Sequence, residues 1–100
     1  MIVSRRTFQA KVGKGGAVIE NLKKTQAIVN ASGMQAGRIL TDYLSGATDR
    51  ISWELEVEDL SALEALMNGY GAMGEQIGPI IEDLYALIDG ASVEHWHIVE

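Results

Sequence analysis

The two histidines of the chain lie two residues apart, in the segment His95-Trp96-His97. Side chains at positions i and i+2 of a strand share one face about 7 Å apart, close enough to bind one divalent metal. The spacing therefore suits a metal or haem site, a general base, or a pair of imidazoles hydrogen-bonded at an interface. Because no further ligand motif accompanies the pair, we expect no bound metal and no cofactor. His95 and His97 are kept as candidate catalytic residues.

A second group of polar residues alternates with apolar ones in the segment from Ile51 to Glu58. Ser52, Glu54 and Glu56 would share one face of a strand there. Paired carboxylates can act as acid and base when their surroundings separate their pKa values. They can equally form cross-strand ion pairs, for which the candidate cations are Arg5, Arg6 and Arg38.

Other familiar catalytic arrangements are absent from the sequence. Two histidines on one predicted strand give no context for a Ser-His-Asp set, and no nucleophile elbow is present. The segment Gly13-Lys14-Gly15-Gly16 precedes a predicted helix but lacks the spacing of phosphate-binding loops, so we interpret it as a turn. With no cysteine in the chain, disulfides and thiolate sites are excluded, and a reducing cytoplasm is the expected location.

Charge is divided unevenly between the two halves of the chain. The first fifty residues contain all eight lysines and arginines and carry a net +5, whereas the second fifty contain eleven carboxylates and no basic residue. The overall charge of −6 argues against nonspecific binding of nucleic acid. No apolar run approaches the length of a membrane span, so no membrane attachment is expected. One hundred residues, 47% of them hydrophobic, are expected to form a single domain, residues 1–100.

Four segments have the alternation and the flanking turn residues of strands. Trp53 and Trp96, which lie in the third and fourth of these segments, are expected to be core aromatics on the helix side of the sheet. The predicted strands are Ile2 to Lys11, Ala36 to Leu44, Asp49 to Glu58 and Ser92 to Glu100.

Helical spacing predicts a long helix from Ala17 to Ala31. A second helix begins at Ser61, where the hydroxyl group and the Glu64 carboxylate have the spacing of a capping box. The glycine-rich stretch Asn68 to Gly74 interrupts this helix, and the helical spacing then resumes and ends at Gly90. The element order is therefore β-α-β-β-α-α-β.

This order is that of a ferredoxin-like α+β fold, with two βαβ units and a four-stranded antiparallel sheet in the order 4-1-3-2. It places basic strands beside acidic strands, so we expect Arg–Glu pairs across the sheet. Helices can cover only one face, yet three strands have apolar residues on both faces. A second copy of the chain is the simplest cover for the open face, and we predict a homodimer.

The element order, the turn Val12 to Gly16, the segment Glu58 to Leu63 and the broken second helix resemble dimeric α/β-barrel proteins. Within that superfamily the chain is most similar to NIPSNAP-type domains and small antibiotic-biosynthesis-monooxygenase-like domains. The resemblance implies that two sheets face each other across a dimer, with the helices outside. It does not name a reaction, because the superfamily includes oxygenases, haem-binding enzymes, cyclases and proteins of unknown activity.

Three functions are compatible with these observations. The first is binding of a small organic ligand in a cavity between the two sheets. The second is a cofactor-independent monooxygenase or cyclase acting on an aromatic or polyketide-like substrate, for which one histidine would be the base. The third is a structural or regulatory dimer without a ligand. For the first two, the residues expected to point into one cavity are Arg5, Ser52, Glu54, Glu56, His95 and His97.

Overall fold

Seven elements follow one another along the chain in the predicted order β-α-β-β-α-α-β. The computed structural model describes all residues from 1 to 100. The elements are β1 (Ile2–Ala10), α1 (Gly15–Ala31), β2 (Arg38–Thr41), β3 (Arg50–Val57), α2 (Leu60–Gly71), α3 (Gly74–Tyr85) and β4 (Ile88–His97).

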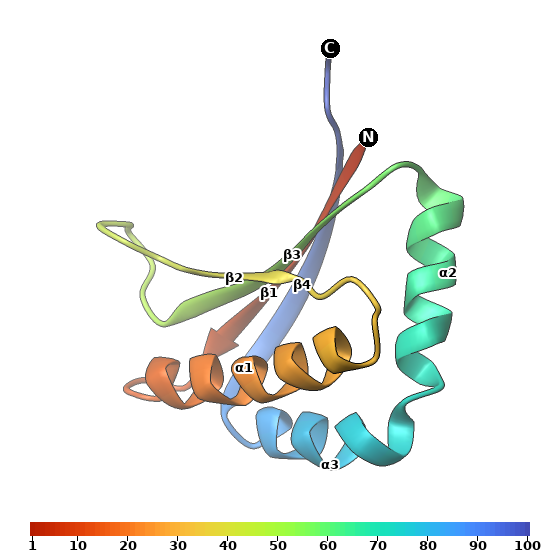
Figure 1. Cartoon of the computed structure of the whole chain (residues 1–100). Coiled ribbons are helices and arrows are strands. Elements are labelled where there is room, and N and C mark those ends of the chain that lie inside the picture. The colour runs from red at the N-terminus through yellow and green to blue at the C-terminus, as the bar shows by residue number, and fades with distance from the viewer.

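The four strands form one sheet in the order β2-β3-β1-β4. Counted from the opposite edge, this is the order 4-1-3-2, and every neighbouring pair is antiparallel. The three helices lie on one side of the sheet, so its other face is open (Figure 1). None of these helices has both the length and the apolar character that a bilayer crossing requires.

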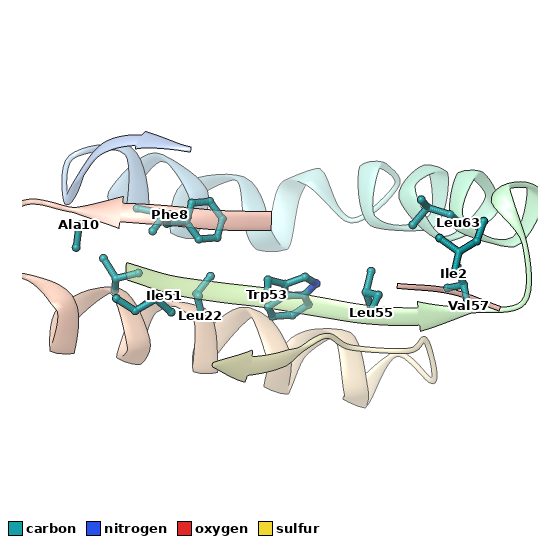
Figure 2. Close-up of a cluster of buried hydrophobic side chains, with 11 residues drawn as sticks. Ile2, Phe8, Ala10, Leu22, Ile51, Trp53, Leu55, Val57 and Leu63 are labelled. Carbon is teal, nitrogen blue, oxygen red and sulfur yellow. The ribbon is translucent and has the colours of Figure 1, made fainter. Parts of the chain in front are cut away.

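The hydrophobic core lies between the helices and one face of β1 and β3. In Figure 2 the side chains of these strands face Leu22 of α1 and Leu63 of α2. The strand pattern explains this layer, because alternate residues of β3 point to the helices and are almost fully buried. The strand residues of the core are Ile2, Phe8, Ala10, Ile51, Trp53, Leu55 and Val57.

Trp53 requires a glycine beside it on the chain segment that leads into β2. A Cβ atom added to Gly37 would lie 2.4 Å from atoms of the Trp53 ring. The Trp53 ring also meets the ring of Tyr70 in α2 edge to face, with ring centroids 6.3 Å apart. The Tyr70 hydroxyl group donates a hydrogen bond to the carbonyl oxygen of Gln35. Trp53 therefore joins β3, α2 and the approach to β2, and its predicted core position is confirmed.

Two strands differ from their predicted ranges by more than one residue. β2 spans only Arg38–Thr41 rather than Ala36 to Leu44, and Leu44 itself has a positive φ of 54°, outside the extended region. β4 begins at Ile88 rather than at Ser92, because Ile88 pairs with Ala10 after a register shift at the end of β1. It ends at His97, where its partner strand also ends.

The predicted extension of the last helix to Gly90 is wrong. α3 ends at Tyr85, and after one turn the chain enters β4. The start of α2 also differs, because its N-cap is Asp59 rather than Ser61. The Asp59 carboxylate accepts a hydrogen bond of 2.8 Å from the backbone amide of Ala62. The predicted break within the glycine-rich stretch is present and lies between Gly71 and Gly74.

Candidate functional site

The strand register determines which side chains share the open face of the sheet. Arg5 of β1 lies opposite Glu54 of β3 on one side and opposite Glu94 of β4 on the other. Arg38 of β2 lies opposite Glu54. Since directly opposed residues of antiparallel strands point to the same face, these charges form one row across the sheet. The basic and acidic halves of the chain thus alternate, as expected from the strand order.

Glu54 is the centre of this row. Its side chain is only 3% exposed, and its two oxygens are bound by two arginines. Arg5 Nε donates to Oε2 at 2.7 Å, and Arg38 Nε donates to Oε1 at 2.9 Å. A second nitrogen of the Arg38 guanidinium group also contacts Oε1. The predicted cross-strand Arg–Glu pairing is confirmed for Glu54.

The arginines determine the ionisation of this carboxyl group. Burial by itself would raise the pKa of Glu54, but the hydrogen bonds and charges of Arg38 and Arg5 outweigh it and hold the pKa below its ordinary value. Correspondingly, the hydrogen bond to Glu54 raises the pKa of Arg38. Glu54 therefore stays ionised at neutral pH and is unsuited to donate a proton as a general acid.

A cavity of about 320 Å³ adjoins the charged row on the open face. We call it the sheet-face cavity. One of its lining residues is hydrophobic, and the others present guanidinium, carboxylate and hydroxyl groups. Its walls come from all four strands and from the loop between β2 and β3. They are Arg5, Thr7, Leu40, Thr41, Asp42, Ser45, Arg50, Ser52 and Glu94.

Polar contacts fix parts of the cavity wall. The hydroxyl oxygens of Thr7 and Ser52 lie 2.9 Å apart and form a hydrogen bond between β1 and β3. Asp42 Oδ2 accepts a hydrogen bond of 3.2 Å from the Arg50 backbone amide. The Arg50 Nε atom lies 3.6 Å from the same carboxylate oxygen, is buried, and has no hydrogen-bond partner. The wall therefore contains a charged donor that is not fully satisfied by protein groups.

The histidines do not join this site. His95 lies opposite Ser4 and His97 lies opposite Ile2, and both of these β1 residues are buried on the helix side. The prediction that the histidines share one cavity with Arg5 and Glu54 is therefore wrong within this chain. Trp96 takes the opposite face from the histidines and is 57% exposed, so its predicted core position is also wrong.

The remaining predicted site residues lie in two different places. Arg5 and Ser52 line the sheet-face cavity, and Glu54 holds Arg5 in place. Glu56 is exposed, forms no ion pair and lines a different groove beside α2. The chain contains no group of three or more His, Asp or Glu side chains placed to hold a metal ion.

Sequence reasoning missed most of the cavity wall, although a simple signal was available. Thr7 follows Arg5 by two residues, and Arg50 precedes Ser52 by two, so strand alternation alone predicts that each pair shares a face. Asp42 could not be placed in this way, because it lies in the loop after β2.

Comparison with known proteins gives the fold and no sequence family. No protein-family model and no curated protein matches the chain. A NIPSNAP domain protein from Burkholderia xenovorans has a similar structure, with a TM-score of 0.82 and 14% identity over 99% of this chain and 95% of that one. A NIPSNAP family protein from Agrobacterium tumefaciens gives a TM-score of 0.81 at 15% identity, covering 99% and 93% of the two chains.

A putative antibiotic biosynthesis monooxygenase from Deinococcus radiodurans is also similar in structure. Its TM-score is 0.64 at 15% identity, and the match covers 100% of this chain and 94% of that one. Identities this low show a shared fold and carry no activity with them. The structural resemblance to NIPSNAP and monooxygenase-like domains, expected from the element order, is confirmed.

Proposed function

We propose that this chain forms a homodimer through its open sheet face and binds a small polar organic molecule in the sheet-face cavity. The observation that carries the proposal is the cavity itself, a hollow of about 320 Å³ lined mostly by polar and charged side chains from four strands and one loop. Its volume is near the lower end of the range for small-molecule sites. Its polar lining favours a ligand with hydrogen-bonding groups over a purely apolar one.

Dimerisation would serve this binding by closing the cavity. The face around it is shallow and open to water, and it exposes Trp96 and Leu40 as well as the charged row. An exposed aromatic and an exposed aliphatic side chain on one sheet face are typical of an interface. A second copy placed over this face would bury both side chains and exclude water from the ligand.

Binding is proposed in preference to oxygenase or cyclase activity. Some proteins of similar structure carry the name monooxygenase, and a cofactor-independent reaction of that kind needs a base beside the substrate. His95 and His97 were the candidate bases, and they lie on the helix side of the sheet. Glu54 is fully engaged by two arginines. The open face therefore offers polar contacts but neither of the histidine bases expected for such a reaction.

The composition of the chain supports a proposal about its location. A chain without cysteine has no need of an oxidising compartment. We propose that it acts in the cytoplasm, and cell fractionation with an antibody against the chain would test this.

Binding can be tested by NMR titration with a library of small hydroxy acids, amides and amino acids. We expect the backbone amide signals of Thr7, Thr41 and Ser52 to shift for at least one probe. Ser52→Leu, which adds bulk to the cavity wall, should abolish those shifts while leaving the circular dichroism spectrum unchanged. Ser61→Leu is the control, because Ser61 is exposed on α2 away from the cavity. Probe shifts that survive in Ser52→Leu, or a library without any binder, would contradict the proposal.

A further inference from the structure

A second hollow lies beside the C-terminal end of β3, and it shares no lining residue with the sheet-face cavity. β2 pairs with β3 only as far as Glu54, so the end of β3 has no strand neighbour on that edge. There β3 borders α2, which stands at the end of the sheet in Figure 1. A groove of about 470 Å³ runs between them. We call it the α2 groove.

The floor of the α2 groove is apolar and continuous with the core. Val57 is buried, and Ala62 and Leu66 of α2 pack against the core cluster. Met34 forms one wall and fits closely against α2, since a Cβ atom at Gly69 would lie 2.6 Å from the Met34 sulfur. The groove therefore offers apolar contacts to an apolar body.

Hydrogen bonds hold the wall formed by Met34 and Gln35 in position. The Gln35 amide nitrogen Nε2 donates to the Glu56 carbonyl oxygen at 2.9 Å, which ties the wall to β3. The Gln35 carbonyl oxygen accepts from the Tyr70 hydroxyl group, which ties the same wall to α2. Burial raises the pKa of Tyr70 to about 12, so this donor keeps its proton at physiological pH. The groove is thus formed before any ligand arrives.

The charged side chains that line the α2 groove are all acidic. Two carboxylates, Glu56 and Glu58, line it, and no basic residue does. Neither carboxylate takes part in an ion pair or a side-chain hydrogen bond. The charge of Glu56 contributes to the raised pKa of Arg38, but the Arg38 guanidinium group is bound to Glu54. The positive end of α2 is offset by the Asp59 carboxylate that caps it.

We infer that the α2 groove binds a small organic cation with an apolar body, of the arylalkyl or alkyl ammonium class. The apolar floor accepts the hydrocarbon part, and the two unpaired carboxylates attract the ammonium group at the rim. This site is separate from the sheet-face cavity and does not depend on the function proposed for it.

The test is an NMR titration of the full chain with 2-phenylethylammonium, 2-phenylethanol and 3-phenylpropionate. We expect the cation to shift the signals of Ala62 and Ala65, the neutral alcohol to bind several-fold more weakly, and the anion to bind least. Exposed ion pairs contribute modestly, so Glu56→Gln or Glu58→Gln should each weaken binding of the cation about two- to fivefold. Ala65→Leu, at an exposed lining position of the helix, should block both the cation and the alcohol.

Glu64→Gln is the matched control, because Glu64 is exposed on α2, lies outside the groove lining and loses the same charge. It should bind the cation as the unmodified chain does. Equal affinity for the cation and the alcohol would overturn the inference, as would equal weakening by Glu64→Gln and Glu58→Gln. Shifts confined to Thr7 and Ser52 would also overturn it, since they would place the ligand in the sheet-face cavity.

Discussion

Glu54 is a carboxylate whose charge is balanced by two arginines on neighbouring strands. Replacing it by glutamine keeps the shape of the side chain but removes the negative charge that links β3 to β1 and β2. We expect Glu54→Gln to lower the free energy of unfolding by about 1.5–3 kcal/mol, the range for hydrogen bonds to charged groups. Chemical denaturation measures this. Glu56→Gln is the control on the same strand, and it should change stability by less than about 0.5 kcal/mol. Equal effects of the two substitutions would contradict the assigned pairing.

The pH dependence of stability follows from the same carboxylate. The pKa of Glu54 in the folded chain lies below its ordinary value of 4.5, so the unfolded chain takes up a proton first as the pH falls. The contribution of Glu54 is therefore complete above pH 4.5 and is lost as the pH falls through the folded-state pKa. The stability difference between the unmodified chain and Glu54→Gln should be constant near neutral pH and should shrink in acid. A stability difference that grows in acid would show that folding raises the pKa of Glu54 rather than lowering it.

At the scale of the element, two residues, Asp59 and Ser61, are possible caps for the start of α2. The structure assigns the cap to Asp59, whose carboxylate accepts from the amide of Ala62. Asp59→Ala should therefore cost about 1 kcal/mol of stability, the usual loss for a helix cap. Ser61→Ala should have a much smaller effect, although sequence spacing favoured Ser61. Thermal unfolding of both variants measures the difference, and a larger loss from Ser61→Ala would reverse the assignment.

The order of the elements was predictable, while some of their ends and one strand's faces were not. Helical and strand periods in the sequence correspond to all seven elements. The alternation of His95 and His97 against Trp96 was also right, but their faces were assigned in reverse. β4 is an edge strand whose residues are exposed from Asp89 onwards on both faces, so burial gives no preference there. Its orientation is fixed by register with β1, which local sequence does not reveal.

The candidate site was predicted in part for a related reason. Arg5, Ser52 and Glu54 were correctly placed together because they lie on central strands, where one face must be buried. Glu56 points to the same face of β3 as Glu54. However, β2 begins opposite Glu54, so Glu56 has no neighbour in β2. Periodicity gives the face of a residue, whereas the extent of the neighbouring strand decides which hollow it lines.

At the scale of the whole molecule, the open face makes the oligomeric state testable. Trp96 is 57% exposed on that face, and a dimer built on it would bury the indole ring. We expect the chain to sediment as a dimer and Trp96→Lys to shift it to monomer, because a charge would then be buried without a partner. Tyr85→Lys is the control, since Tyr85 is similarly exposed, at 65%, but lies on α3. Monomeric sedimentation of the unmodified chain at micromolar concentration would contradict the dimer.

The position of β1 in the sheet has a consequence for how the chain folds. β1 is the first strand to be synthesised, yet it pairs with β3 and β4, so that Ile2 lies opposite both Val57 and His97. Closing such long loops before any contact is gained makes folding slower than that of helical bundles, whose contacts are mostly local. During translation β1 has no strand neighbour until β3 appears, and its second edge stays open until β4 has left the ribosome. The sheet can therefore be completed only after synthesis of β4, and one edge of β1 stays unpaired until then.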